Sequence, residues 1–204
     1  VMQPRVKRFV EKIDGLVNGL EEKMRGLLLD DAELDLESLA EGADTTLKVK
    51  EEDKDLFERL NKSVKELKEL RWRYTEGPSG RGRAHMAMTN STGCSSVWGS
   101  TYPYNPYPFP WVNHLFQDAP SIAIGIFEGH MRKMGDNFMS VRKADLLLND
   151  EFDEAEFNQA FLEFDWQQFT DEEFDLCPPI LAMGGDGAML DIGFQNVSRL
   201  LASG

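Results

Sequence analysis

The C-terminal part of the chain constrains the fold most, because it combines a predicted strand, a glycine-rich turn and a predicted helix in direct succession. Residues 180–183 (Ile-Leu-Ala-Met) form a short apolar run typical of a buried strand, and residues 184–187 (Gly-Gly-Asp-Gly) follow at once. Over residues 188–203, apolar residues recur at helical spacing. This order is the repeating unit of an open α/β sheet, in which ligands lie beyond the carboxyl ends of the strands. We therefore expect an α/β fold with a partial, mostly parallel sheet.

The acidic residue in the turn narrows the kind of ligand. Glycines let the backbone approach a ligand closely, and the start of a helix favours a phosphate group. A bare carboxylate at Asp186 would repel an anion unless a cation lay between them, which suggests a Mg²⁺ ion shared by Asp186 and a diphosphate. The alternative is a plain tight turn in which Asp186 caps the helix. On these four residues alone the plain turn is the simpler interpretation.

A second loop of small residues follows another predicted strand. Residues 85–89 (His-Met-Ala-Met-Thr) are consistent with a buried strand, and residues 90–96 (Asn-Ser-Thr-Gly-Cys-Ser-Ser) have the composition of a site loop. Cys94 in such a loop can be a nucleophile, a metal ligand or a small buried apolar residue. Because the three histidines are scattered along the chain, no spacing fixes a base for Cys94. The spacing alone favours an inert cysteine.

The first part of the chain predicts a helical hairpin. Apolar residues recur at three and four over residues 5–28 and over residues 53–74, with Lys and Glu between them. Residues 29–52 are acidic and weakly periodic, which indicates a loop or a marginal helix. The Gly-Pro-Ser-Gly run at residues 77–80 marks a boundary. We predict that the hairpin is an appendage or insertion spanning residues 1–78.

The remainder, residues 79–204, is predicted to be a second domain that carries an acidic, aromatic insertion at residues 149–177. Residues 98–110 are too rich in Pro, Tyr and Gly for regular structure. Residues 121–127 fit either a strand or the start of a long helix. Residues 150–175 carry eleven acids and no Lys or Arg, interleaved with aromatic residues, which predicts short helices on a surface. A solvated insertion is favoured over a partner-docking face.

Composition limits the partners and the compartment. The net charge of −14, from 36 acidic and 22 basic residues, argues against nucleic acid and against an anionic membrane surface. The N-terminal residues lack the plan of a signal peptide, and no apolar run has the length of a membrane span. The two cysteines, Cys94 and Cys177, lie outside any C-x-x-C motif, so a reducing, cytoplasmic location is expected. We expect both ends of the chain to be internal to a longer protein.

Three blocks of the sequence, in the same order, resemble the pyruvate:ferredoxin (or flavodoxin) oxidoreductases. The first is Thr-Gly-Cys-Ser-Ser-Val-Trp-Gly at residues 92–99. The second, Pro-Trp-Val-Asn-His-Leu-Phe-Gln-Asp at residues 110–118, is similar to the family's aromatic, Asn, Ser-Leu-Phe-Glu-Asp block. The third combines residues 184–194 with residues 200–204. The chain thus resembles part of the thiamine-diphosphate-binding domain, and this resemblance favours a helix over residues 119–137.

The resemblance implies a reaction, cofactors and partners. The chain is expected to be a fragment of an enzyme that oxidatively decarboxylates pyruvate, or another 2-oxoacid, to acetyl-CoA. The implied cofactors are thiamine diphosphate, Mg²⁺ and a 4Fe–4S cluster, and the implied partners are coenzyme A and ferredoxin or flavodoxin. The fragment is expected to be inactive without the remaining domains of the same enzyme.

The resemblance also assigns cofactor-binding residues, although it assigns no catalytic one. Asp186 matches the acidic Mg²⁺ ligand of the thiamine-diphosphate motif. Gly185, Gly187 and Ala188 match the turn around the diphosphate. Cys94 matches a cysteine that ligates the iron–sulfur cluster nearest the thiamine and lines the cofactor pocket.

The sequence departs from the family in two respects. The family's Cys-x-Gly-Cys-Gly-Glu ligands should lie shortly before residues 92–94, where this chain has no other cysteine. The Asn-Thr half of the Mg²⁺ motif should follow Asp186 at a distance that lies beyond Gly204. Cys177 matches no block and is interpreted as structural. The alternative function is therefore a degenerate, non-catalytic homologue that serves as an assembly or interaction module.

Overall fold

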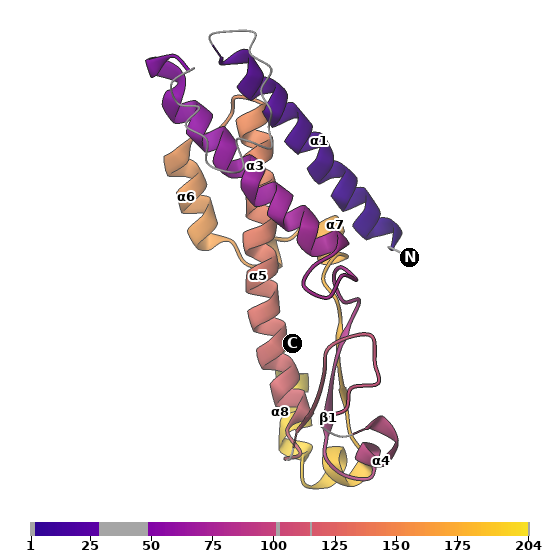
Figure 1. Ribbon diagram of the computed structural model, residues 1–204. Coiled ribbons are helices and arrows are strands. Elements are labelled where there is room, and N and C mark those ends of the chain that lie inside the picture. The colour runs from indigo at the N-terminus through magenta and orange to yellow at the C-terminus, as the bar shows by residue number, and fades with distance from the viewer. Residues whose placement is uncertain (1–2, 29–48, 101–102, 115, 204) are drawn as a thin grey trace. The chain divides into compact units, whose positions relative to one another are not determined.

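The computed structural model forms two compact units (Figure 1). It describes residues 3–28, 49–100, 103–114 and 116–203. One unit, here the helical unit, combines Val1–Arg83 with Gly135–Phe164, and the other, here the sheet unit, combines Ala84–Met134 with Asp165–Gly204. Helix α5 (Ala119–Leu148) therefore contributes its first residues to the sheet unit and its last residues to the helical unit.

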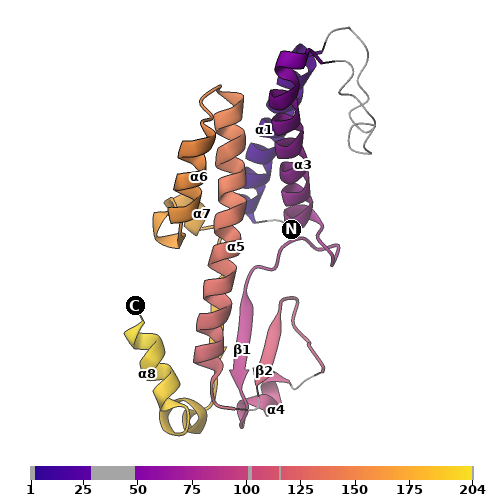
Figure 2. The same cartoon turned by 90° about the vertical axis from the view of Figure 1, so that its left-hand side faces the viewer.

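An antiparallel pair of helices forms most of the helical unit, as the sequence periodicity predicts. Helix α1 (Pro4–Gly26) begins at a proline, which suits the first helical turn, and it packs side by side with α3 (Lys54–Thr75) (Figures 1 and 2). The short 3₁₀ turn η2 (Glu51–Asp53) leads into α3. Most of the predicted acidic loop, residues 29–48, lies outside the described residues.

The core of the helical unit is an apolar layer shared by α1, α3 and the second half of α5. Its fully buried side chains come from all three helices and include Ile13, Leu20, Leu60, Leu67 and Phe138. An aromatic contact runs through this layer: the ring of Phe9 lies 5.1 Å from that of Tyr74 and 6.0 Å from that of Phe138. Burying each such side chain contributes about 1.5–3 kcal/mol, so this layer is what holds the unit together.

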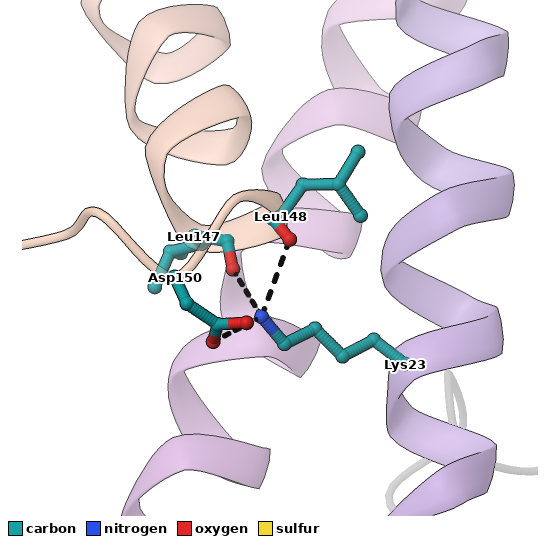
Figure 3. A network of polar contacts seen from close by, with 4 residues as sticks. All are labelled: Lys23, Leu147, Leu148 and Asp150. Atoms are coloured by element: carbon teal, nitrogen blue, oxygen red, sulfur yellow. Dashed lines mark hydrogen bonds and ion pairs between the residues drawn. The ribbon is translucent and has the colours of Figure 1, made fainter.

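The end of α5 is held by a lysine from α1. Lys23 Nζ donates to the carbonyl oxygens of Leu147 and Leu148 at 2.7 and 3.3 Å, and it pairs with Asp150 Oδ1 at 2.5 Å (Figure 3). The last carbonyls of a helix lack partners within the helix and carry the negative end of its dipole. The ammonium group therefore satisfies these carbonyls and binds α5 to α1.

We expect Lys23→Met to destabilise the helical unit by about 1–2 kcal/mol, because the substitution keeps the apolar stem and removes the cap. Arg25→Met is the matched control, since Arg25 is exposed and belongs to the same last turn of α1. Urea unfolding followed by circular dichroism measures both variants. Equal losses in the two variants would contradict a capping role for Lys23.

The acidic, aromatic segment forms short capped helices, as predicted. Helix α6 (Glu154–Glu163) starts where the side chain of Asp153 accepts a hydrogen bond from the backbone of Glu156. The 3₁₀ turn η3 (Trp166–Gln168) and helix α7 (Asp171–Phe174) follow in the sheet unit, and Thr170 and Glu173 form a capping box at α7. Each of these helical segments thus begins at a capping side chain, namely Asp153, Asp165 and Thr170.

The sheet unit contains three parallel strands in the order β2-β1-β3, so the predicted α/β class is confirmed. The strands are β1 (Ala87–Ser91), β2 (Trp111–His114) and β3 (Ile180–Met183). Strand β2 was not predicted. Between β1 and β2 the chain forms the short helix α4 (Ser95–Gly99), and residues 103–110 form neither helix nor strand.

Helix α5 covers one face of this sheet at its start. Thr89 Oγ1 donates to the carbonyl of Ala119 at 3.1 Å, and Ser91 Oγ accepts from the Ala119 amide at 3.2 Å. The helical alternative for residues 121–127 is therefore confirmed and the strand alternative is wrong. Among the described residues, no helix combines the length and the apolar character needed to cross a membrane.

The helix predicted over residues 188–203 is interrupted at residues 192 and 193. A five-residue π turn, η4 (Gly187–Asp191), follows β3, and helix α8 (Phe194–Ala202) begins only after Gly193. The amide of Ile192 donates to the carbonyl of Gly187 at 3.0 Å, which closes the wider turn. Helical spacing of the apolar residues did not reveal this interruption.

Candidate functional site

The two loops singled out from the sequence emerge at the same edge of the sheet. Because all three strands are parallel, residues 92–94 after β1, residues 116–118 after β2 and residues 184–186 after β3 all follow carboxyl ends. Strands β1 and β3 are direct neighbours, so Cys94 and Asp186 lie in adjacent loops. Figure 2 shows α4 beyond the end of β1, at this edge.

The glycine turn packs directly against the end of β1. Asn90 pairs with Met183, which brings the following residues, Ser91 and Gly184, opposite each other. A Cβ atom on Gly184 would lie 3.2 Å from the Cβ of Ser91 and 3.0 Å from Cε of Met189. A residue without a side chain thus allows the close approach of the two strand ends.

Asp186 presents an exposed carboxylate at this edge. It occupies the N-cap position of η4, but its side chain makes no capping hydrogen bond, so the capping alternative is wrong for this turn. Of its neighbours, Gly187 is exposed, Gly185 is half-buried and Ala188 is buried. A carboxylate that is not used for capping, beside glycine backbone, can take a hard cation as a ligand.

Cys94 is an exposed free thiol at the start of α4, so it is not the small buried residue that the spacing alone favoured. Cys177 likewise forms no disulfide, and its Sγ donates to the Glu173 carbonyl at 3.6 Å. Cys177 precedes β3, at the opposite edge of the sheet from Cys94. Within the described ranges, no group of three or more His, Cys, Asp or Glu side chains is arranged to hold a metal ion.

A hydrogen-bonded cluster that the sequence analysis missed, centred on the buried Asn90, supports the Cys94 loop. Asn90 Nδ2 donates to Asn113 Oδ1 at 3.0 Å, and Asn113 Nδ2 donates to Ser96 Oγ at 3.2 Å. Asn90 is fully buried, and its Oδ1 has no hydrogen-bond partner. These residues tie the first turn of α4 to the ends of β1 and β2. The available signal was an asparagine in each of β1 and β2, since buried amides need partners.

Gly193 is required by the turn that follows Asp186. A Cβ atom there would lie 1.9 Å from the carbonyl oxygen of Ala188 and 2.6 Å from that of Gln117. Both obstacles are backbone atoms that cannot rotate away. We therefore expect Gly193→Ala to displace the turn and to destabilise the sheet unit by about 1–3 kcal/mol.

Gly185→Ala is the control for this prediction, because a Cβ atom on Gly185 meets nothing within 4 Å. Thermal unfolding of both variants in the full-length protein provides the comparison. A stable Gly193→Ala variant with unchanged near-ultraviolet circular dichroism would show that the turn does not depend on this glycine.

The fold and the site together define an α/β protein in which the loops at the carboxyl ends of the parallel strands are placed to bind a ligand. Comparison with known proteins finds distant relatives whose names agree with the family resemblance. The chain is 29% identical over 154 residues to the pyruvate-flavodoxin oxidoreductase of Klebsiella pneumoniae, a match that covers 58% of this chain and 13% of that protein. It is 28% identical over 116 residues to the pyruvate synthase subunit PorB of Pyrococcus furiosus, which covers 57% of this chain and 23% of that subunit.

A further match, over a shorter stretch, is to the pyruvate dehydrogenase (NADP+) of Cryptosporidium parvum, at 35% identity over 79 residues, or 35% of this chain and 4% of that protein. No family model and no solved structure matches the chain. The chain is thus a distant relative of oxidoreductases and synthases named for pyruvate, and it spans less than a quarter of the length of these relatives.

Proposed function

We propose that the chain is part of a thiamine-diphosphate-dependent 2-oxoacid:ferredoxin or flavodoxin oxidoreductase that acts on pyruvate or a related 2-oxoacid. The observation that carries this proposal is the placement of Cys94 and Asp186 in adjacent loops at the carboxyl ends of β1 and β3. These residues lie far apart in the sequence, and an electron acceptor beside a cofactor requires that they lie close in space. The distant relatives named for pyruvate support the same conclusion.

In this proposal Asp186 is one ligand of a Mg²⁺ ion that also binds the diphosphate of thiamine diphosphate. The residues present fit such a group, because the carboxylate is exposed and makes no capping bond, and Gly185 and Gly187 leave the backbone accessible. When bound, thiamine diphosphate supplies the electron sink for decarboxylation of a 2-oxoacid. The part played by this chain is to anchor and orient that cofactor, with Ala188 packed beneath the turn.

For the iron–sulfur cluster, Cys94 is the proposed ligand, but the chain by itself does not provide a complete site. A 4Fe–4S cluster is held by four cysteine thiolates, and the described residues bring one cysteine to this edge. Cys177 lies at the opposite edge and remains a structural residue in this proposal. The other thiolates must therefore come from parts of the protein outside this chain.

The direct test is turnover by the full-length protein under anaerobic conditions. We expect pyruvate, or another 2-oxoacid, to support coenzyme-A-dependent reduction of ferredoxin or flavodoxin. Tight binding of thiamine diphosphate without turnover of any 2-oxoacid would refute the oxidoreductase assignment but would support the proposed cofactor site. Absence of both binding and turnover would favour the non-catalytic assembly module.

A further inference from the structure

A chain of hydrogen bonds runs from the Cys94 loop to the helix that follows the Asp186 turn. Gln117, in the loop between β2 and α5, donates from Nε2 to the carbonyl of Thr92 at 3.1 Å. The carbonyl of Gln117 in turn accepts from Asn196 Nδ2 at 2.8 Å. Gln117 thus contacts the Cys94 loop through its side chain and α8 through its backbone carbonyl.

The orientation of both amides follows from chemistry. A backbone carbonyl only accepts hydrogen bonds, so the nitrogen of each side-chain amide must face it. The other end of the Asn196 amide is also engaged, because Ser121 Oγ, in the first turn of α5, donates to Asn196 Oδ1 at 2.8 Å. Asn196 is therefore fixed at both ends and can hold the Gln117 backbone in one place.

Close backbone packing reinforces the same junction. Gly193, which directly precedes α8, packs against the Gln117 carbonyl. A Cβ atom on Gly193 would lie 2.6 Å from that oxygen. The turn that contains Asp186 is continuous in sequence with Gly193, and its own start packs against the end of β1. Displacement of either loop must therefore be transmitted to Gln117 or break one of its two bonds.

We propose that Gln117 is a positioning residue that, together with Asn196, couples the Cys94 loop to the Asp186 turn. The roles of Cys94 and Asp186 rest on the proposed function, but the coupling itself rests on the bonds described. Two consecutive bonds, from Thr92 to Gln117 and from Gln117 to Asn196, form this route between the Cys94 loop and α8, beside the direct packing of Gly184 against Ser91. Breaking either bond interrupts this route, so breaking both should add nothing to the effect of breaking one.

The test uses isosteric variants of the full-length protein. Gln117→Glu and Asn196→Asp keep the side-chain volume, but at neutral pH their carboxylates cannot donate to a carbonyl. Hydrogen exchange of the Ser96 and Val97 amides reports opening of the Cys94 loop, because these amides bond to Gly93 and Cys94 in the first turn of α4. We expect each variant to raise these exchange rates about fivefold, the factor that corresponds to one hydrogen bond.

Two features separate positioning from general destabilisation. The double variant should match either single variant, since links in series are not additive. In Gln117→Glu the excess exchange over wild type should shrink as the pH falls toward about 4.3, the ordinary value for a glutamic acid, because the protonated acid donates again. Gln195→Leu is the control, since Gln195 is the exposed neighbour of Asn196.

Amide exchange in the ligand-free protein tests the coupling independently of whether the ligand binds. Unchanged Ser96 and Val97 exchange in Asn196→Asp, or simple addition in the double variant, would overturn the coupling even if thiamine diphosphate binds normally. Failure of the wild-type protein to bind Mg²⁺ and thiamine diphosphate would instead overturn the proposed function. With coupling intact and the ligand bound, exchange at Ser96 and Val97 should slow in wild type and stay unchanged in Gln117→Glu.

Discussion

Replacing Asp186 by alanine in the full-length protein is expected to weaken Mg²⁺-dependent binding of thiamine diphosphate by at least about a hundredfold. Loss of a residue that merely supports a metal ligand already costs about 10–100-fold in metal affinity, and Asp186 is proposed to be a ligand itself. Its carboxylate makes no capping bond, so the turn itself should survive the substitution. Isothermal titration with thiamine diphosphate, with and without Mg²⁺, measures the change.

Asp191→Ala is the matched control for this prediction. Asp191 is also an exposed acid, and it ends the same π turn. Its replacement by alanine removes the same charge from the surface. Affinity should therefore be nearly unchanged in Asp191→Ala and lost in Asp186→Ala. Equal affinities in both variants would show that the acidic ligand lies elsewhere.

Replacing Phe138 by alanine is expected to destabilise the helical unit by about 3–5 kcal/mol, the range for removing a buried aromatic side chain. Phe138 is 1% exposed, and its ring meets that of Phe9 edge to face at 6.0 Å. The substitution leaves a cavity where α5 packs against α1. This loss is comparable with the whole stability of a small domain, so much of the protein should be unfolded at room temperature.

Urea unfolding with Phe161→Ala as the control tests this prediction. Phe161 carries the same side chain but lies exposed on α6, so its removal should change the free energy of unfolding by less than about 0.5 kcal/mol. A similar small change in Phe138→Ala would mean that the second half of α5 does not belong to the core of the helical unit.

Much of the fold could be predicted because long helices carry a strong periodic signal. The α1 and α3 pattern repeats over six turns or so, and burial of that stripe dominates the energy of the pair. Strand β2 was missed because it has four residues and carries Asn113 and His114 at its end, so neither alternation nor an apolar run marks it. Its pairing with β1, which the local sequence does not encode, makes it a strand.

The motifs of the candidate site could be predicted from the sequence, but the hydrogen bonds that support them could not. Asp186 and Cys94 stand in short runs of small residues that the sequence marks as loops, and the family resemblance assigned their roles. The supporting bonds of Asn90, Asn113 and Gln117 join residues from separate strands and loops. Such contacts exist only once the parallel strands align, and no local pattern specifies them. The interruption before α8 was missed for the same reason, since Gly193 packs against the backbone of Gln117 in a distant loop.

The central claim is that the acid in the glycine turn binds the cation that holds a diphosphate. The most direct measurement is a crystal structure of the full-length protein with thiamine diphosphate and Mn²⁺ in place of Mg²⁺, with the metal located by anomalous scattering. The account predicts a metal peak about 2.1 Å from a carboxylate oxygen of Asp186, at the carboxyl edge of β1 and β3. A metal and diphosphate bound at any other place, with Asp186 left in solvent, would contradict it.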